Sequence, residues 1–248
     1  MNIMKQQRVS ELSTDVLSPK VVIIYNPFAG RGKASRVAQQ SKKYLEKNNW
    51  QVSAVIATEY AGHVEKVLAN EWGPKVQLIV LVGGDGTLRE LVAGLWSAKL
   101  DVEIGFIPMG NANVIARELH IPLHPVAAIQ LLTTGTATRV DLCILKQQNQ
   151  LDLIFLAMLE IGYGAKTVQL ADQLRNNSLK KLYRFWGDLV YVIAGLLALK
   201  KLGRDTFTVK TESLGPTLKS SHCVIANTQT YAKGWSLTPE AKFNDGIL

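Results

Sequence analysis

The sequence predicts an α/β fold in which a parallel sheet covered by helices is followed by a second, mainly β domain. Strand-like and helix-like segments alternate four times, with short loops, between residues 20 and 107. The strand-like segments are nearly continuous apolar runs, typical of parallel strands buried on both faces. After about residue 135 the pattern changes to alternating β segments around a long helical stretch.

In the first domain, each predicted strand is an apolar run followed by a loop and a helix. KVVIIY is β-branched and is interrupted by NPFAGRGK, and the helix that follows stops at Asn48 and Asn49. Pro108 ends the last run. We expect strands at 20–25, 50–58, 76–82 and 102–107, and helices at 34–47, 62–70 and 88–98.

The second domain begins with two apolar segments, RVDLCILKQ and LDLIFLAMLEIG, which we expect to form a hairpin. A helical stretch is predicted over 165–201, and DTFTVKTE and KSSHCVIANT then alternate in the β manner. The expected divisions are a disordered tail at 1–19, a first domain at 20–135 and a β-rich second domain at 136–248.

Composition favours a basic protein with anionic partners. The chain has a net charge of +8, a pI of about 9.4 and 47% apolar residues. Cys143 and Cys223 have no metal-ligand spacing, so we expect reduced core cysteines and a cytoplasmic location. The N-terminus has no apolar segment of the signal-peptide type, and the longest apolar run, 189–199, is too short to span a bilayer.

Three predicted strand ends carry unusual loops: NPFAGRGK, GGDGT and PMGNANVIAR. In a parallel sheet these loops meet at one edge, where glycines and helix N-termini can approach a phosphate. Asp85, an anion, cannot bind phosphate itself but can hold Mg²⁺, while Thr87 can donate a hydroxyl and Lys33 a charge. The alternative is an ordinary turn, since Pro27 excludes a Walker P-loop and Ser35 breaks a dinucleotide fingerprint.

In order and spacing, NPFAGRGK, TEYAGH, GGDGTLRE and PMGNANVIAR resemble the diacylglycerol kinase catalytic-domain family of bacterial lipid kinases and sphingosine kinases. This family is related in fold to NAD kinases and phosphofructokinases. The resemblance covers almost everything after residue 20. It implies a Rossmann-like nucleotide-binding domain, then a β-sandwich domain, with the active site in the cleft. It also implies ATP-dependent, Mg²⁺-dependent phosphorylation of a lipid hydroxyl.

The resemblance also implies roles for individual residues. Asp85 is the expected catalytic carboxylate and a metal ligand. A second magnesium site, structural or regulatory, would use Asp245 with the backbone carbonyls of Lys242 and Ile247. His63 matches a family position, but a role at a helix start explains it equally well. The expected nucleotide contacts are Asn26, Pro27, Phe28, Ala29, Gly30, Lys33, Thr58, Gly83, Gly84, Asp85, Gly86, Thr87, Leu88, Arg89, Glu90 and Asn111.

The sequence departs from the family pattern at several positions. Asn111 replaces a threonine and Val114 an aspartate, and Gly164 stands where an acid is common. The family motif continues beyond Leu248 to a DGE aspartate, the proposed general base. We therefore expect a truncated product that binds nucleotide but turns over poorly, with a marginally stable second domain.

Three functions remain open: a lipid kinase, a soluble-substrate kinase such as NAD kinase, and a catalytically impaired nucleotide- or lipid-binding protein. Diacylglycerol, phosphatidylglycerol, a sphingoid base and an undecaprenyl-like alcohol are all candidate substrates. The basic stretch around 180–204 suits peripheral contact with an anionic membrane surface, although a core helix with solvated ends explains it as well. A homodimer is an open option. No nucleic-acid-binding motif is present.

Overall fold

The computed structural model describes residues 2–5, 20–64, 66–67, 76–149, 152–176, 187–199, 206–210, 217–231 and 236–248. The chain divides into two compact units. The first unit contains Met1–Ala157 together with Asn227–Leu248, and the second contains Met158–Ala226.

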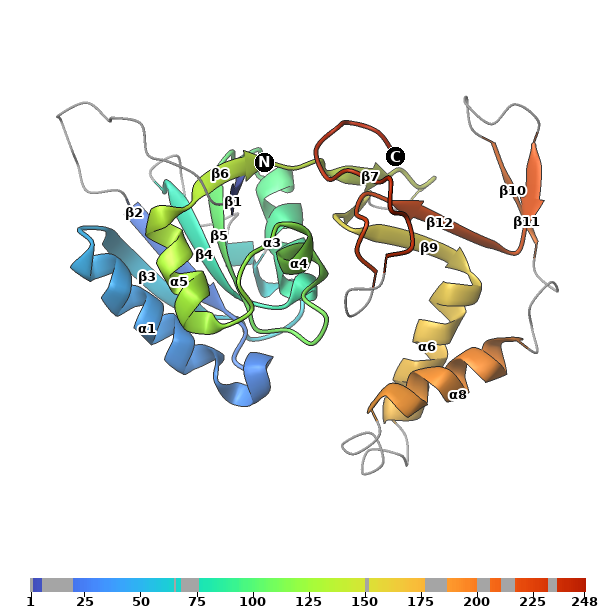
Figure 1. Ribbon diagram of the computed structural model, residues 1–248, viewed down its shortest axis with the longest axis horizontal. Helices are drawn as coiled ribbons and strands as arrows, with labels where there is room; N and C mark the ends of the chain where they lie inside the picture. The colour runs from blue at the N-terminus through green and yellow to red at the C-terminus, as the bar shows by residue number, and fades with distance from the viewer. Residues whose placement is uncertain are drawn as a thin grey trace. The chain divides into compact units, whose positions relative to one another are not determined.

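A six-stranded sheet forms the centre of the first unit (Figure 1). All neighbouring strands are parallel except the last pair, β1 and β6, which is antiparallel. The residues of β4 are all buried, as a strand covered on both faces requires. The strand order is β3 (Gln51–Ala57), β2 (Lys20–Tyr25), β4 (Leu78–Gly83), β5 (Glu103–Pro108), β1 (Asn2–Lys5) and β6 (Thr136–Arg139).

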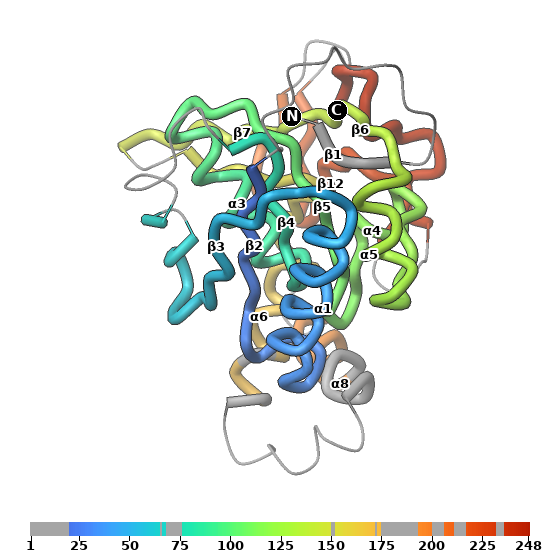
Figure 2. The backbone as a smooth tube through the Cα atoms, turned by 90° about the vertical axis from the view of Figure 1, so that its left-hand side faces the viewer, coloured from blue at the N-terminus to red at the C-terminus, as the bar shows by residue number. Residues whose placement is uncertain are grey.

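Helices cover both faces of this sheet. The chain leaves β2 in one direction to reach β3, then returns past β2 to reach β4 and β5. Right-handed crossovers in opposite directions place the intervening helices on opposite faces. Accordingly α1 (Ala34–Lys47) packs on β2, β3 and β4 beside α5 (Pro125–Thr134), while α3 (Asp85–Ser97) lies behind the sheet (Figure 2). The short helix α4 spans Val114–Glu118.

The four predicted strands of the parallel sheet are confirmed, and two expectations at its far edge differ from the structure. Residues 2–5, placed by sequence in a disordered tail, form β1 and pair with β5 and β6. Residues 136–139, placed in the second domain, form β6 of the same sheet. Of the helix expected at 62–70, residues 63–64 and 66–67 are helical, Gly62 lies in a turn, and residues 65 and 68–70 lie outside the described residues. Residues 6–19 are likewise outside them.

The second unit contains short antiparallel pairs and two helices. β9 (Met158–Gly162) pairs with β12 (His222–Ala226), and β10 (Phe207–Val209) pairs with β11 (Leu218–Ser220). The expected helical stretch consists of α6 (Tyr163–Asn176) and α8 (Gly187–Leu199), with 177–186 outside the described residues. The predicted hairpin forms only in part, between β7 (Cys143–Leu145) and β8 (Leu153–Phe155) in the first unit.

Asn227 fixes the point at which the chain re-enters the first unit. Its side chain is 1% exposed. Its backbone N–H donates to the Ala157 carbonyl at 2.8 Å, and its Nδ2 donates to the Leu156 carbonyl at 2.8 Å. The segment that follows returns Phe243 to the main hydrophobic core.

Candidate phosphate-binding site

Four loops meet where the parallel strands β3, β2, β4 and β5 end. The Thr58 N–H donates to the Tyr25 carbonyl at 2.8 Å, which holds the loop after β3 beside the end of β2. The Asn26 N–H donates to the Val82 carbonyl at 3.0 Å, which holds the loop after β2 beside the end of β4. The strand order reverses between β2 and β4, and such a switch point is where open α/β sheets bind ligands.

Met109 links the first loop to the others. Its carbonyl accepts the Gly30 N–H at 2.8 Å, and its own N–H donates to the Gly83 carbonyl at 2.6 Å. Gly30 has φ +58°, and a side chain there would also collide with the Met109 methyl group. Glycine at position 30 therefore serves both the left-handed turn and the close packing against Met109.

The loops after β4 and β5 touch through their backbones. A Cβ added to Gly110 would lie 2.7 Å from the Cα of Gly84 and 2.8 Å from Oδ1 of Asn113. Any side chain at Gly110 would push the two loops apart. Together with the Met109 bonds, this contact joins the three glycine-containing loops that were predicted from sequence into one assembly.

Asp85 spans the same two loops through its side chain. Oδ2 accepts the Val114 N–H at 3.1 Å, and Oδ1 accepts the Ile115 N–H at 3.2 Å. Both donors belong to the first turn of α4. The carboxylate expected to hold a metal therefore also caps a neighbouring helix.

Asn26 and Thr87 form a polar pair at the start of α3. Asn26 Nδ2 donates to Thr87 Oγ1 at 3.4 Å, and Asn26 Oδ1 accepts the Phe28 N–H at 3.0 Å. No side-chain cap bonds the N-terminus of α3, and a Cβ at Gly86 would meet open space. The first N–H groups of a helix have no intrahelical partner, so this end of α3 can receive an anion.

The other expected contact residues divide by exposure. Lys33, Arg89 and Asn111 are exposed at or near this edge, as is the Phe28 side chain (83%). Leu88 is fully buried in the main core, so its side chain packs and does not face the loops. His63 accepts the Glu59 N–H at 3.1 Å through Nδ1, a bond within the loop after β3.

The expected second metal site lies at the C-terminal turn of the first unit. Asp245 Oδ1 accepts the Ile247 N–H at 3.1 Å, a local turn bond. Asp141, which sequence reasoning missed, accepts the Gly246 N–H at 2.7 Å through Oδ2 and donates its own N–H to Phe243. Among the described residues, no group of three or more His, Cys, Asp or Glu side chains is arranged to hold a metal.

Two other positioning residues, Met109 and Asn113, also went unnoticed in the sequence. Both lie inside the PMGNANVIAR loop that was singled out, but an apolar and an amide side chain give no chemical signal there. Met109 acts through its backbone N–H and carbonyl, and Asn113 acts through its side-chain amide, which bonds to the backbone of Gly110.

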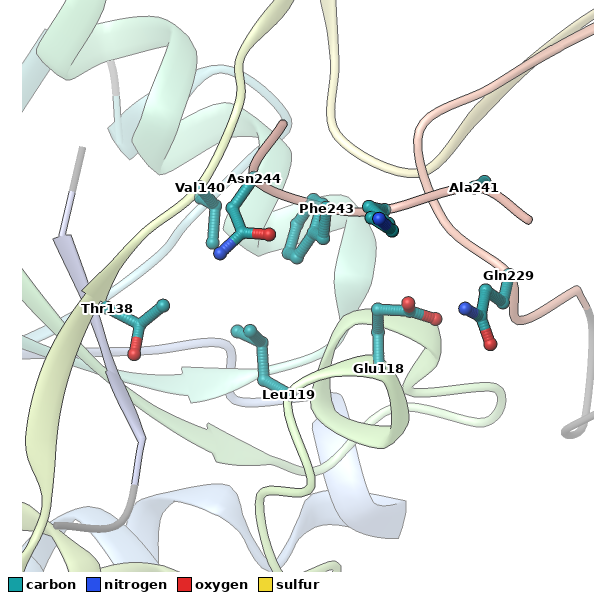
Figure 3. A pocket seen from close by; sticks show the side chains of 9 residues that line it. Glu118, Leu119, Thr138, Val140, Gln229, Ala241, Phe243 and Asn244 are labelled. Atoms are coloured by element: carbon teal, nitrogen blue, oxygen red, sulfur yellow. The ribbon is translucent and has the colours of Figure 1, made fainter. Parts of the chain in front are cut away.

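Two cavities of the first unit lie away from these loops. One, of about 180 Å³, is lined by Leu119, Val140 and Phe243, with Glu118 and Gln229 at one side (Figure 3). The other, of about 460 Å³, lies between the C-terminal part of α3 and the start of β5, next to Trp96 and Arg139.

Comparison with known proteins identifies two matching domain families. The diacylglycerol kinase catalytic domain model matches residues 20–145, and the YegS C-terminal NAD kinase β-sandwich-like domain model matches residues 157–248. A diacylglycerol kinase of Staphylococcus epidermidis is 29% identical over 230 residues, covering 91% of this chain and 67% of that protein. One from Staphylococcus aureus is 28% identical over 228 residues, covering 91% and 68%.

Solved structures support the fold. A putative diacylglycerol kinase from Bacillus anthracis superposes with a TM-score of 0.70 at 24% sequence identity, covering 96% of this chain and 74% of that one. The predicted parallel-sheet domain followed by a β-sandwich-like domain is thereby confirmed. Because the first family model matches just over half of the 248 residues and includes every loop of the candidate site, the chain belongs to the diacylglycerol kinase catalytic-domain family and is an enzyme of the kinase class.

Proposed function

We propose that the protein transfers the γ-phosphoryl group of ATP to the hydroxyl group of a lipid. The observation that carries the proposal is the joining of the loops after β2, β4 and β5 at the switch point of the sheet. That arrangement suits a nucleoside triphosphate. Membership of the family supports kinase chemistry with a lipid acceptor.

In this proposal, the backbone of the three loops binds the phosphates. Gly30 and Arg31 both have positive φ, of 58° and 57°, and the turn they form can direct backbone N–H groups toward an anion. The uncapped N-terminus of α3 adds its positive dipole end. Lys33, exposed where α1 begins, supplies a mobile positive charge.

The residues present fit a magnesium ion that is shared with the nucleotide. Mg²⁺ in kinases uses one or two carboxylates plus substrate phosphates, without a complete protein cage. Asp85 is the acidic side chain at the loops, and each of its oxygens accepts one N–H and keeps a further lone pair. Such an ion would neutralise charge on the transferred phosphoryl group.

We place the acceptor lipid with the β-rich part of the chain and the protein at the cytoplasmic surface of an anionic membrane. Leu196 and Leu199 on α8 are 60% and 47% exposed, and Val168 on α6 is 47% exposed. Residues 175–204 contain seven Lys or Arg and one Asp, a net charge of +6 out of the chain's +8. Exposed leucines flanked by cations favour interfacial binding. No helix among the described residues is long and apolar enough to cross a membrane.

A soluble-substrate kinase is the second candidate. Residues 157–248 match a domain that is described as similar to the β-sandwich of NAD kinase. This likeness supports a soluble acceptor such as NAD. The acceptor therefore has to be identified by experiment.

The test is transfer of radiolabel from γ-labelled ATP in the presence of Mg²⁺. Acceptors would be diacylglycerol, phosphatidylglycerol, a sphingoid base and undecaprenol in mixed micelles, and NAD in solution. Lys33→Gln would be compared with Lys43→Gln, a matched exposed lysine on α1. We expect label in one lipid and a loss of rate only with Lys33→Gln. Label in NAD alone would support the second candidate, and nucleotide binding with no transfer would support an impaired kinase.

A further inference from the structure

We propose that Asp85 is a positioning residue, whose carboxylate closes the N-terminus of α4 and so holds the loop after β5 against the loop after β4. The consequence of this capping for nucleotide binding rests on the proposed function. The capping itself rests on contacts within the first unit alone.

The helix α4 has no cap of its own. The residue at its N-cap position, Asn113, has a left-handed backbone with φ +50°. Its side chain is engaged with Gly110 instead, accepting that residue's N–H at 2.9 Å and donating to its carbonyl at 3.0 Å. The first N–H groups of α4 would therefore lack acceptors. Asp85 supplies an acceptor oxygen to two of these N–H groups, those of Val114 and Ile115.

The carboxylate suits this position electrostatically. Asp85 is the first residue of α3, so the N-terminal ends of α3 and α4 converge on one negative charge. Partial positive charges at helix N-termini favour a carboxylate. Its two bonds use the backbone N–H groups of Val114 and Ile115, so the side chain at position 114 is not involved. The chain can therefore accommodate valine at position 114, where the resemblance described above implies aspartate.

The consequence reaches the phosphate-binding loops. The segment from Gly110 to Asn113 is held at one end by the contact between Gly110 and Gly84, and at the other by the capping of α4. Without the carboxylate, the second restraint is lost. The loop would then no longer be fixed beside the N-terminus of α3.

A positioning role and a purely metal-binding role differ in the protein without metal or nucleotide. If Asp85 only held Mg²⁺, its replacement would leave the apo protein unchanged. If it caps α4, replacement alters the apo protein. Asp85→Ala is the sharpest variant because it removes both acceptor oxygens, whereas the amide oxygen of Asp85→Asn could still accept one of the two N–H groups.

The experiment is residue-resolved amide hydrogen exchange of the full chain in EDTA, with ATP affinity measured in the same buffer. Asp101→Ala is the matched control, since Asp101 is 69% exposed and its ion pair with Arg139 is long, at 3.9 Å. We expect the Val114 and Ile115 amides to exchange at least about tenfold faster in Asp85→Ala, the factor that a lost charged hydrogen bond implies. The affinity of the same variant for ATP without metal should also fall, and the control should match the wild type in both measurements.

Unchanged exchange at Val114 and Ile115, with ATP binding weakened only when Mg²⁺ is present, would overturn the proposal in favour of metal ligation. If Asp85→Ala does not fold, the wild type decides. Its Val114 and Ile115 amides should be protected relative to those of Asn111 and Ala112, and equal exchange would contradict the capping role. Because exchange is measured without nucleotide, this result is independent of whether the protein proves to be a lipid kinase.

Discussion

The two units of the chain hold together in different ways. In the first, the central strands are sealed by helices, and side chains such as Ile23, Leu81 and Ile104 are fully buried. Among the described residues of the second, Ala171 and Ala194 form a buried cluster, with Leu170 and Leu174 partly buried against them. Small side chains remove little apolar surface from water, so this alanine cluster contributes much less stability than the sheet of the first unit.

This difference matches the demands of the proposed reaction. A phosphate-binding edge requires backbone groups held at fixed positions, and a densely packed sheet provides them. The helices of the second unit instead leave leucines at the surface, where a lipid or a membrane can meet them. The contrast can be tested with matched substitutions in each unit.

The largest effect is expected from removing core volume in the first unit. Leu81→Ala should lower the free energy of unfolding by about 2–5 kcal/mol, because Leu81 is fully buried in the middle of β4. Leu196→Ala in α8 should change it by about 0.5 kcal/mol or less, because that side chain is 60% exposed. Urea denaturation of the two variants measures the difference. Equal losses in the free energy of unfolding would contradict the difference in packing between the two units.

A smaller loss is expected at the contact between the loops. Gly110→Ala should cost about 1–3 kcal/mol, since its methyl group would press on the Gly84 backbone. Gly86→Ala meets open space and should leave thermal stability unchanged, yet weaken ATP binding because the phosphates would occupy that space in the proposed site. Thermal melts and calorimetric titrations separate the two effects. A stable Gly110→Ala protein with normal ATP affinity would count against the joined loops.

Asn113→Ala should cost about 1–2 kcal/mol, because it removes both amide bonds to Gly110. Its left-handed backbone adds to the loss, since alanine adopts that conformation less readily than asparagine. Asn111→Ala is the control, as Asn111 is exposed on the same loop. Thermal melting of both variants decides, and a larger loss in the control would be inconsistent with this role.

The smallest effect concerns the two free cysteines, one in each unit. Burial, and then the charge of Asp141, raises the pKa of the Cys143 thiol from its ordinary value of 9.0 to about 11. The raised pKa favours the folded state below pH 9.0, and this contribution is lost as pH rises through about 11. At pH 8 to 9, iodoacetamide should therefore modify Cys223, which is half-buried, faster than Cys143. Mass spectrometry of the peptides that contain Cys143 and Cys223 measures the two rates. Faster modification of Cys143 would mean that the first unit is loosely packed around that residue.

Much of the fold could be predicted because the signals are local. The apolar runs gave strands within about two residues of their observed bounds, and glycines at the strand ends marked the loops. Strand β1 and the edge strand β6 were missed, because NIMK and TATR are short and depend on pairing partners far along the chain. Long-range pairing leaves no periodic pattern in a four-residue segment.

The candidate site was predictable in its residue types and not in its internal bonds. Gly30, Gly84 and Asp85 stand out in the sequence because glycine and carboxylate are unusual at the end of a buried strand. That Asp85 would bond to the backbone of α4 depends on how two loops pack, which the sequence alone does not state. The same holds for Asp141, whose partner Gly246 lies more than a hundred residues away.

The most direct test of this account is an exchange footprint of ATP with Mg²⁺ on the full chain. We predict slower amide exchange at residues 26–33, 83–87 and 110–115, with no change around Trp96 and Arg139 at the larger cavity. Protection at that cavity, or none at the three loops despite saturating ATP, would contradict a nucleotide site at the switch point of the sheet.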